Sequence, residues 1–174
     1  MIANDGDIAA RAAALHDHGR DAEGEITGWG LNSRLDNLQA AILGYRLKKY
    51  GAVIERRRTL ARTYRGELGD VAEIVLPPGP DGDPGHFDVY QNYEIEAERR
   101  DDLREFLKTR GIGTLVPWGG KAVHQWEALG LRVHLPRTEK LFERALLLPM
   151  HAWLLEDEIA AVAAAVREFY GDER

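Results

Sequence analysis

The chain has 174 residues, of which 44% are hydrophobic, enough for a globular domain with a buried core. Its 23 Lys and Arg residues against 29 Asp and Glu residues give a net charge of −6, which argues against general nucleic-acid binding because phosphate backbones require a basic face. The absence of cysteine excludes disulfides and thiolate metal sites. No apolar run approaches the roughly 20 residues of a membrane span, and the N-terminal residues lack a signal-peptide pattern. We therefore expect a cytoplasmic protein whose partners include neither membrane nor nucleic acid.

The first predicted element is a helix that begins at Asn4 or Asp5 and ends near Gly19. Asn and Asp are favoured caps at a helix N-terminus, and glycine is favoured just past the C-terminus. The residues that follow, 20–31, are polar and rich in glycine, which predicts a loop.

A second, longer helix is predicted to begin near Ser33. Ser33 with Asp36 three residues later is a variant of the capping box. Apolar residues then recur at helical spacing: Leu35, Leu38, Ile42 and Tyr45. Asn32 would lie at the N-terminus of this helix, where unsatisfied N–H groups and the helix dipole favour an anion such as phosphate. An ordinary capped helix after a turn is the alternative, and spacing alone favours it.

The helical pattern continues to Leu68, and Gly51 is the expected place of a break. The apolar residues of this stretch keep a three-four spacing that only Arg57 interrupts: Leu47, Tyr50, Ile54, Ala61, Tyr64 and Leu68. Such a seam predicts packing along the whole length within its own domain, with a dimer interface as the alternative. The basic cluster Arg56–Arg58 is interpreted as a solvated face.

The remaining chain predicts a small sheet covered by helices. A loop rich in proline and glycine occupies residues 77–85. Beyond it, the periodicity predicts strands over 88–96, 112–118 and 146–148, and helices near 103–111, 122–129, 138–145 and 156–169. Glu94, Glu96 and Glu98 share one strand face, and we interpret them as a solvated edge because they have neither converging ligands nor an apolar setting.

Six motifs in order carry a family resemblance. The longest is Gly-Leu-Asn-Ser-Arg-Leu-Asp-Asn-Leu-Gln-Ala-Ala-Ile-Leu at residues 30–43. The others are Asn-Asp-Gly-Asp-Ile-Ala-Ala-Arg at 4–11, His-Asp-His-Gly-Arg at 16–20, Gly-Ile-Gly-Thr at 111–114, Leu-Pro-Arg-Thr-Glu at 135–139 and Leu-Leu-Leu-Pro-Met at 146–150. Together they resemble the DegT/DnrJ/EryC1/StrS aminotransferases, the pyridoxal-phosphate enzymes that aminate keto-sugars on nucleotide carriers.

The resemblance implies an α/β (α+β) fold, namely the C-terminal small domain of a fold-type I pyridoxal-phosphate (PLP) transferase. It implies a small, mostly antiparallel sheet covered by helices and a long bridging helix. Residues 1–31 are then a remnant of the large cofactor domain, beginning with the end of a strand at residues 1–3. Residues 32–76 form the helical bridge, and residues 77–174 form the small domain.

The resemblance also implies what the chain lacks. Members of the family have a lysine that forms the Schiff base with PLP and an aspartate that pairs with the pyridine nitrogen. Both residues lie N-terminal to the segment that corresponds to this chain, which begins at Met1. The lysines of this chain occupy other positions: Lys48, Lys49, Lys108, Lys121 and Lys140. We therefore expect a C-terminal region that does not form the internal aldimine by itself. A non-catalytic nucleotide-sugar-binding or dimerisation module is the alternative.

Asn32 and Arg34 are the predicted cofactor-binding residues. In the family that the chain resembles, the asparagine at this place reaches across a homodimer and donates to the cofactor phosphate bound by the neighbouring subunit. Arg34 is adjacent, and its guanidinium presents a bidentate fork for a phosphate or a carboxylate. A structural salt bridge is at least as good a prediction for Arg34, and Ser33 is explained as the cap. No residue is assigned a catalytic or metal-binding role.

Trp118, Lys121 and His124 are the predicted substrate-binding residues. Many members of the resembled family have a histidine that faces the sugar nucleotide, and this chain has Pro117 at that position. The family's second histidine in this segment corresponds to His124, which is displaced by one position in this chain. Trp118 is placed to stack on a base or sugar, and Lys121 to meet a diphosphate. Core filling by Trp118 and helix capping by Lys121 are the alternatives. The implied partners are a nucleotide-linked sugar and an amino donor such as glutamate.

Overall fold

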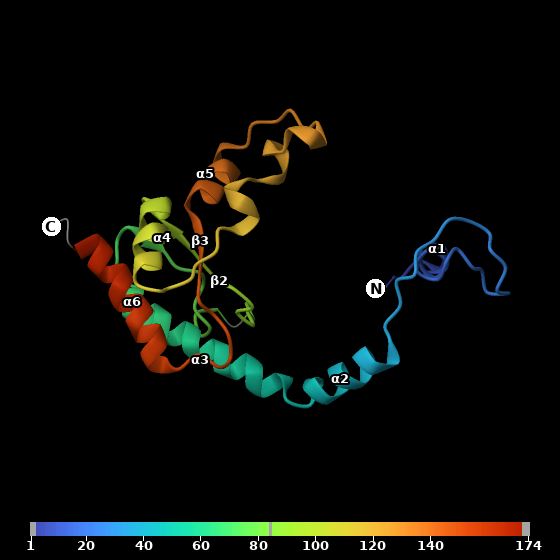
Figure 1. The fold of residues 1–174 in the computed structure, drawn as a ribbon, viewed down its shortest axis with the longest axis horizontal. Helices are drawn as coiled ribbons and strands as arrows, with labels where there is room; N and C mark the ends of the chain where they lie inside the picture. Colours follow the sequence, from blue (N-terminus) through green and yellow to red (C-terminus); the bar gives the residue numbers. More distant parts are fainter. Residues whose placement is uncertain (1–2, 84, 172–174) are drawn as a thin grey trace. The chain divides into compact units, whose positions relative to one another are not determined.

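The computed structural model describes residues 3–83 and 85–171, so most of the strand remnant predicted at residues 1–3 lies outside the described residues. The chain forms two compact units, residues 1–49 and residues 50–174, and each is described by itself. Figure 1 shows the elements of both units.

The first unit begins with helix α1, Gly6–His16, which confirms the first predicted helix. Asp5 is its N-cap, because its Oδ1 accepts from the backbone N–H groups of Asp7 at 2.9 Å and Ile8 at 3.0 Å. The helix ends before His18 and Gly19, which have positive φ angles of 59° and 78°. Among the described residues 3–49, only Gly19 is buried.

The loop after α1 folds back on itself and changes the predicted start of the next helix. Asp17 pairs with Asn32 in an isolated antiparallel bridge, and the N–H of Ser33 donates to the carbonyl of His16 at 3.0 Å. Helix α2, Asn37–Leu47, has Asp36 at its N-cap position. The prediction that Ser33 caps this helix is therefore wrong, because its backbone is engaged in the bridged segment. Asn32 likewise lies in that bridge and not at the helix N-terminus.

The predicted long helix is two helices, α2 and α3, Tyr50–Leu68. The break falls at Lys48–Lys49, and Gly51 lies within the first turn of α3. Helix α2 buries none of its residues, and Leu38 on its apolar spacing is 74% exposed. In α3, by contrast, Ala61, Tyr64 and Leu68 are buried, together with Leu60. The predicted seam is thus packed only in its C-terminal half.

The second unit contains a three-stranded antiparallel sheet of β1 (Ile74–Val75), β2 (Tyr93–Ala97) and β3 (Ala145–Leu148), in the order β1-β2-β3. This confirms the predicted small antiparallel sheet. β2 begins later than predicted because the chain turns before it, at Tyr90 with φ 48°. β2 is also the central strand, so the interpretation of Glu94, Glu96 and Glu98 as an edge is wrong. Glu94 and Glu98 are exposed, and Glu96 is half-buried.

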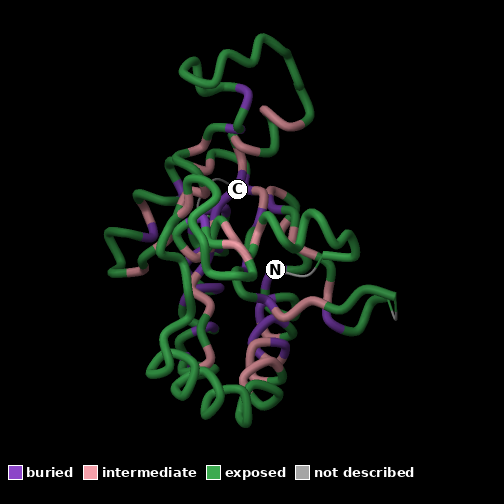
Figure 2. Tube along the Cα trace, turned by 90° about the vertical axis from the view of Figure 1, so that its right-hand side faces the viewer, coloured by how far each residue is buried: buried purple, intermediate pink, exposed green. Residues whose placement is uncertain are grey.

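The core forms where this sheet meets α3, α4 (Arg100–Thr109) and α6 (Glu156–Gly171). Helices α3 and α6 pack side by side, and buried residues are purple in Figure 2. The predicted core face of α6 is confirmed: Ile159, Val162, Ala163, Val166 and Phe169 are buried. Tyr64 of α3 stacks on Tyr93 of β2 with ring centroids 4.6 Å apart, and its hydroxyl donates to the carbonyl of Pro149 at 2.9 Å.

The basic cluster of α3 is not a solvated face. Arg58 is buried, and its guanidinium donates to the carbonyls of Asp88 at 2.9 Å and Pro80 at 2.7 Å. The Arg57 guanidinium donates to the carbonyl of Tyr90 at 2.7 Å. A guanidinium satisfies several carbonyls at once because it presents a planar fork of donors. These arginines therefore tie the irregular segment before β2 to α3.

The segment between α4 and β3 differs most from prediction. Only Leu115 of the predicted strand 112–118 pairs, in an isolated bridge with Leu147. Three single 3₁₀ turns follow at Pro117–Gly120, Val123–Gln125 and Glu127–Leu129. Helix α5, Pro136–Arg144, precedes β3. Figure 1 shows α5 and this segment projecting from the sheet of the second unit.

Candidate functional site

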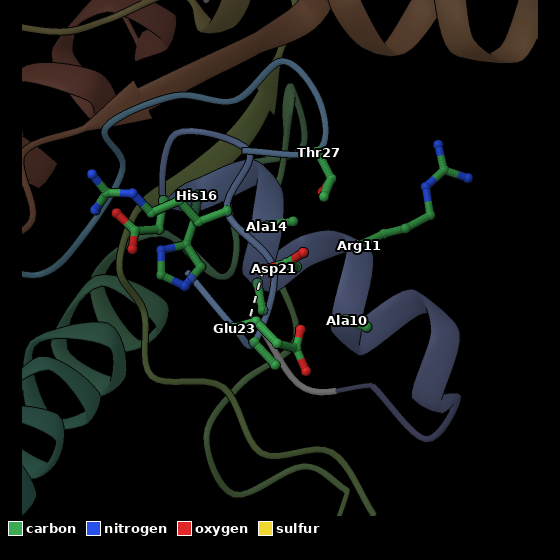
Figure 3. A pocket seen from close by; sticks show the side chains of 11 residues that line it. Ala10, Arg11, Ala14, His16, Asp21, Glu23 and Thr27 are labelled. Atoms are coloured by element: carbon green, nitrogen blue, oxygen red, sulfur yellow. Dashed lines mark hydrogen bonds between the residues drawn. The ribbon is translucent and has the colours of Figure 1, made fainter. Parts of the chain in front are cut away.

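The first unit has a hollow of about 650 Å³ between α1 and the loop that follows it. Its lining includes Arg11, His16, Asp21 and Glu23, which Figure 3 labels. The N–H of Glu23 donates to Oδ1 of Asp21 at 3.1 Å, while the guanidinium of Arg11 extends away from that pair. The lining of this hollow combines charged and small side chains, and it includes none of the sequence-predicted site residues.

Asn32 and Arg34 lie together on the bridged loop of the same unit. Nε of Arg34 donates to Oδ1 of Asn32 at 3.2 Å, and its Nη1 forms an ion pair with Asp17 at 2.6 Å. The predicted structural salt bridge of Arg34 is therefore present. Both side chains are exposed. The side-chain oxygen of Asn32 accepts from Arg34, and its side-chain NH₂ group is the donor that an anion would use.

The second unit has a hollow of about 590 Å³, and the structure brings the other three predicted residues together around it: Trp118, Lys121 and His124. The rest of its lining is mainly apolar and includes Trp126, Leu129 and Phe142. We call this hollow the tryptophan cavity. An apolar hollow with a few polar groups is the usual form of a small-molecule site.

Local backbone geometry presents Trp118 to solvent. Trp118, Gly119 and Gly120 follow Pro117 with positive φ angles of 52°, 66° and 77°. Glycine adopts this left-handed region without cost, whereas a tryptophan there is strained by about 1 kcal/mol or more. The indole is 77% exposed, so it does not fill the core. Strain at a side chain that remains solvent-exposed favours a binding role over a packing role.

Lys121 and Trp126 form one wall of the tryptophan cavity. Nζ of Lys121 lies 5.4 Å from the centroid of the Trp126 ring, which is within cation–π range. The backbone N–H of Ala122 donates to Oε1 of Gln125 at 2.8 Å, and this bond fixes the short turn that carries His124. Lys121 is exposed, and the Val123–Gln125 turn begins two residues beyond it.

His124 is held by an acid that sequence reasoning assigned no role. Its side chain is only 4% exposed, and Nε2 lies 3.0 Å from Oε1 of Glu139 in the first turn of α5. Glu139 also accepts from the N–H of Leu135 at 2.8 Å and contacts Nδ1 of His134 at 3.0 Å. These donors, the Leu135 N–H first and the two histidines after it, hold the pKa of Glu139 below its usual value. Pro136 at the start of α5 signals the helix that carries Glu139.

Among residues 3–83 and 85–171, no group of three or more His, Cys, Asp or Glu side chains is arranged to hold a metal ion. None of the helices in this described part of the chain is long and apolar enough to cross a membrane. The sequence-predicted site residues lie at two places, the Asn32–Arg34 pair and the tryptophan cavity.

Comparison with known families identifies the chain. A model of the DegT/DnrJ/EryC1/StrS aminotransferase family matches residues 1–167. The chain belongs to this family. The DegT/DnrJ/EryC1/StrS resemblance seen in the motifs is thus confirmed, and the α/β fold class is confirmed by the similar solved structures described next.

The relatives of this DegT/DnrJ/EryC1/StrS chain are much longer than it is. A pleiotropic regulatory protein of Geobacillus stearothermophilus is 35% identical, covering 98% of this chain and 46% of that protein. A dTDP-3-amino-3,4,6-trideoxy-alpha-D-glucose transaminase of Streptomyces venezuelae is 34% identical, covering 97% and 45%. The crystal structure of S. venezuelae DesV in complex with a ketimine intermediate matches with a TM-score of 0.83 at 34% identity, covering 97% of this chain and 46% of that one. The chain therefore spans less than half the length of these relatives.

Proposed function

We propose that this chain is the C-terminal, substrate-binding part of a PLP-dependent aminotransferase that acts on a nucleotide-linked keto-sugar. The amino donor is a compound such as glutamate, the working form is a homodimer, and the location is cytoplasmic. Family membership supports the reaction class, and relatives named as sugar transaminases support the substrate class. The predicted division of the chain stays a prediction: a cofactor-domain remnant at residues 1–31, a helical bridge at 32–76 and a small domain at 77–174.

The observation that carries this proposal is the meeting of Trp118, Lys121 and His124 around one hollow. Each contributes chemistry that a nucleotide-linked sugar requires. The exposed indole offers a flat face for a base or sugar, and the lysine amine offers charge to a diphosphate. The buried imidazole offers a fixed hydrogen-bonding group. A hollow of about 590 Å³ lies within the usual range for small-molecule sites.

The phosphate is the part of the cofactor that the Asn32–Arg34 pair is suited to bind. The amide nitrogen of Asn32 and the remaining guanidinium donors of Arg34 suit a phosphate, and Asp17 holds that guanidinium in place at 2.6 Å. When bound, PLP supplies the electron sink for transamination. The five lysines of the chain are exposed, and none has the buried, desolvated setting that activates a lysine as a covalent anchor: Lys48, Lys49, Lys108, Lys121 and Lys140. We propose that the anchoring lysine belongs to the part of the relatives that this chain does not span, and that the chain alone is inactive.

Calorimetric titration of the full chain with dTDP-glucose tests the proposal. We expect binding by the unaltered chain and at least about five-fold weaker binding by Trp118→Ala, because base–aromatic stacking contributes about 1–3 kcal/mol. Trp153→Ala is the matched control, since Trp153 is 85% exposed and does not line the tryptophan cavity. Its affinity should equal that of the unaltered chain. Equal affinities for all three proteins, or no binding by any, would contradict the assignment of this cavity.

A further inference from the structure

Glu139 is the one carboxylate in the described part of the chain that contacts a predicted substrate-binding side chain at the tryptophan cavity. Its Oε1 lies 3.0 Å from Nε2 of His124, although the two residues are 15 positions apart. The backbone N–H of Leu135 donates to the same oxygen, and His134 contacts the same carboxylate from the exposed side. Three parts of the segment that borders the cavity therefore converge on one acidic side chain.

The chemistry of this contact dictates which ring nitrogen carries a proton. An ionised carboxylate only accepts hydrogen bonds, so Nε2 of His124 must be its N–H donor. In the neutral imidazole the other nitrogen, Nδ1, is then an acceptor. Nδ1 has no hydrogen-bond partner among the residues that the structure describes, and the ring lines the tryptophan cavity. A ring without this partner would exchange between two tautomers and change which nitrogen accepts.

We propose that Glu139 is a positioning residue that holds His124 in its Nε2–H tautomer and so presents Nδ1 as a hydrogen-bond acceptor at the tryptophan cavity. The ligand group that this selects is a donor, such as a sugar hydroxyl or the N–H of a base. This consequence for the ligand rests on the proposed function, whereas the tautomer itself does not. Glu139 acts through His124 and need not touch the ligand.

Nitrogen NMR of the full chain, labelled with ¹⁵N-histidine, tests the proposal without any ligand. The spectra are recorded at about pH 8.5, two units above the ordinary histidine pKa of about 6.5, because the two tautomers are distinguishable in a neutral imidazole. The signals of His124 are assigned from their loss in His124→Asn. We expect Nε2 to be protonated and Nδ1 unprotonated in a single tautomer. A ring protonated at Nδ1 would overturn the proposal.

Two variants separate positioning from general disturbance. In Glu139→Ala the two nitrogen signals of His124 should move toward each other, because both tautomers become populated. His134→Ala is the matched control: it removes the exposed imidazole from the same carboxylate and should leave the His124 signals in place. Unchanged His124 signals in folded Glu139→Ala would overturn the proposal. If Glu139→Ala does not fold, the His124 tautomer measured in the unaltered chain decides whether the proposal holds.

A binding experiment keeps this inference apart from the proposed function. With dTDP-glucose as the probe, Glu139→Ala and His124→Ala should each weaken binding about three- to ten-fold, the range for one hydrogen bond. The double variant should be no weaker than His124→Ala, because Glu139 acts through that ring. Additive losses would overturn the positioning role. Absence of binding by the unaltered chain would defeat the proposed function, and the tautomer measurement would then decide the role of Glu139 alone.

Discussion

The two units of the chain bury apolar side chains very differently. Helices α3 and α6 of the second unit pack on each other and bury residues such as Leu60 and Ile159 completely. Helix α2 of the first unit has the same kind of apolar spacing, yet Leu38 is 74% and Ile42 47% exposed. Helical spacing thus predicts that a face is apolar, but it does not identify what covers that face.

The two candidate sites differ in the same way. His124 in the second unit is buried, and Glu139 fixes it on the wall of a hollow. Asn32 and Arg34 in the first unit are exposed and are held to each other and to Asp17. This difference supports our proposal that the second unit supplies a substrate site of its own, while the first unit contributes donors to a cofactor site completed elsewhere.

The largest expected effect comes from a matched pair of leucine truncations. Leu103→Ala removes a fully buried side chain of α4 and should lower the free energy of unfolding by about 2–5 kcal/mol. Leu38→Ala removes an exposed side chain of α2, and we expect a change within about 0.5 kcal/mol. Urea denaturation followed by circular dichroism measures both. Equal losses of unfolding free energy in the two variants would show that α2 is packed in solution, and would contradict the difference in burial between the two units.

An intermediate effect is expected at the buried arginine of α3. Arg58→Ala removes donors to the carbonyls of Asp88 and Pro80 and should cost about 2 kcal/mol, because buried carbonyls lose charged partners. Arg62→Ala is the control, since Arg62 is more exposed and pairs with Asp81 at the surface. The same urea titration should give a clearly smaller loss for this control. A larger loss for Arg62→Ala than for Arg58→Ala would contradict the role assigned to the basic cluster.

The smallest expected effect is a pH dependence confined to the second unit. Burial raises the pKa of Tyr64, Tyr93 and Tyr170 above the ordinary value of about 10. Their contribution to stability is therefore complete below pH 10 and is lost as the pH rises, because the unfolded chain releases these protons first. Unfolding midpoints measured from pH 8 to pH 11 should fall above about pH 10.

Tyr64→Phe sharpens this measurement. Phenylalanine has no phenolic proton, so the variant should lose less stability between pH 9 and pH 11 than the unaltered chain does. At pH 8 it should be less stable by about 1 kcal/mol, since the hydrogen bond to the carbonyl of Pro149 is lost. Identical pH profiles for the two proteins would contradict the burial of this hydroxyl.

The sequence predicts elements whose signals are local. Helix α1 with its Asp5 cap, strand β3 and the buried face of α6 follow from caps and periodicity, and the structure has each of them. The errors arise where a distant partner decides. Ser33 has the residues of a capping box after it, but its N–H donates to the carbonyl of His16. The partners of Arg58 lie 22 and 30 residues away, beyond any local pattern.

The candidate site follows the same rule. Trp118, Lys121 and His124 occur within seven residues of one another, so one short stretch of sequence pointed to all three. Their shared hollow depends on Trp126 and α5, which lie outside that short stretch. The bond between His124 and Glu139 closes a loop of 15 residues whose course no periodicity predicts. Candidate site residues can thus be predicted from a short stretch of sequence, whereas the residues that orient them are found only in the folded structure.

The most direct test of the central claim is covalent trapping of the cofactor. The full chain is incubated with PLP, reduced with borohydride and digested, and the modified lysines are identified by mass spectrometry. Our account predicts no saturable adduct at one defined lysine and no aldimine absorbance band, because this chain supplies only the phosphate and substrate contacts. A stoichiometric adduct on a single lysine, with the matching absorbance band, would contradict it.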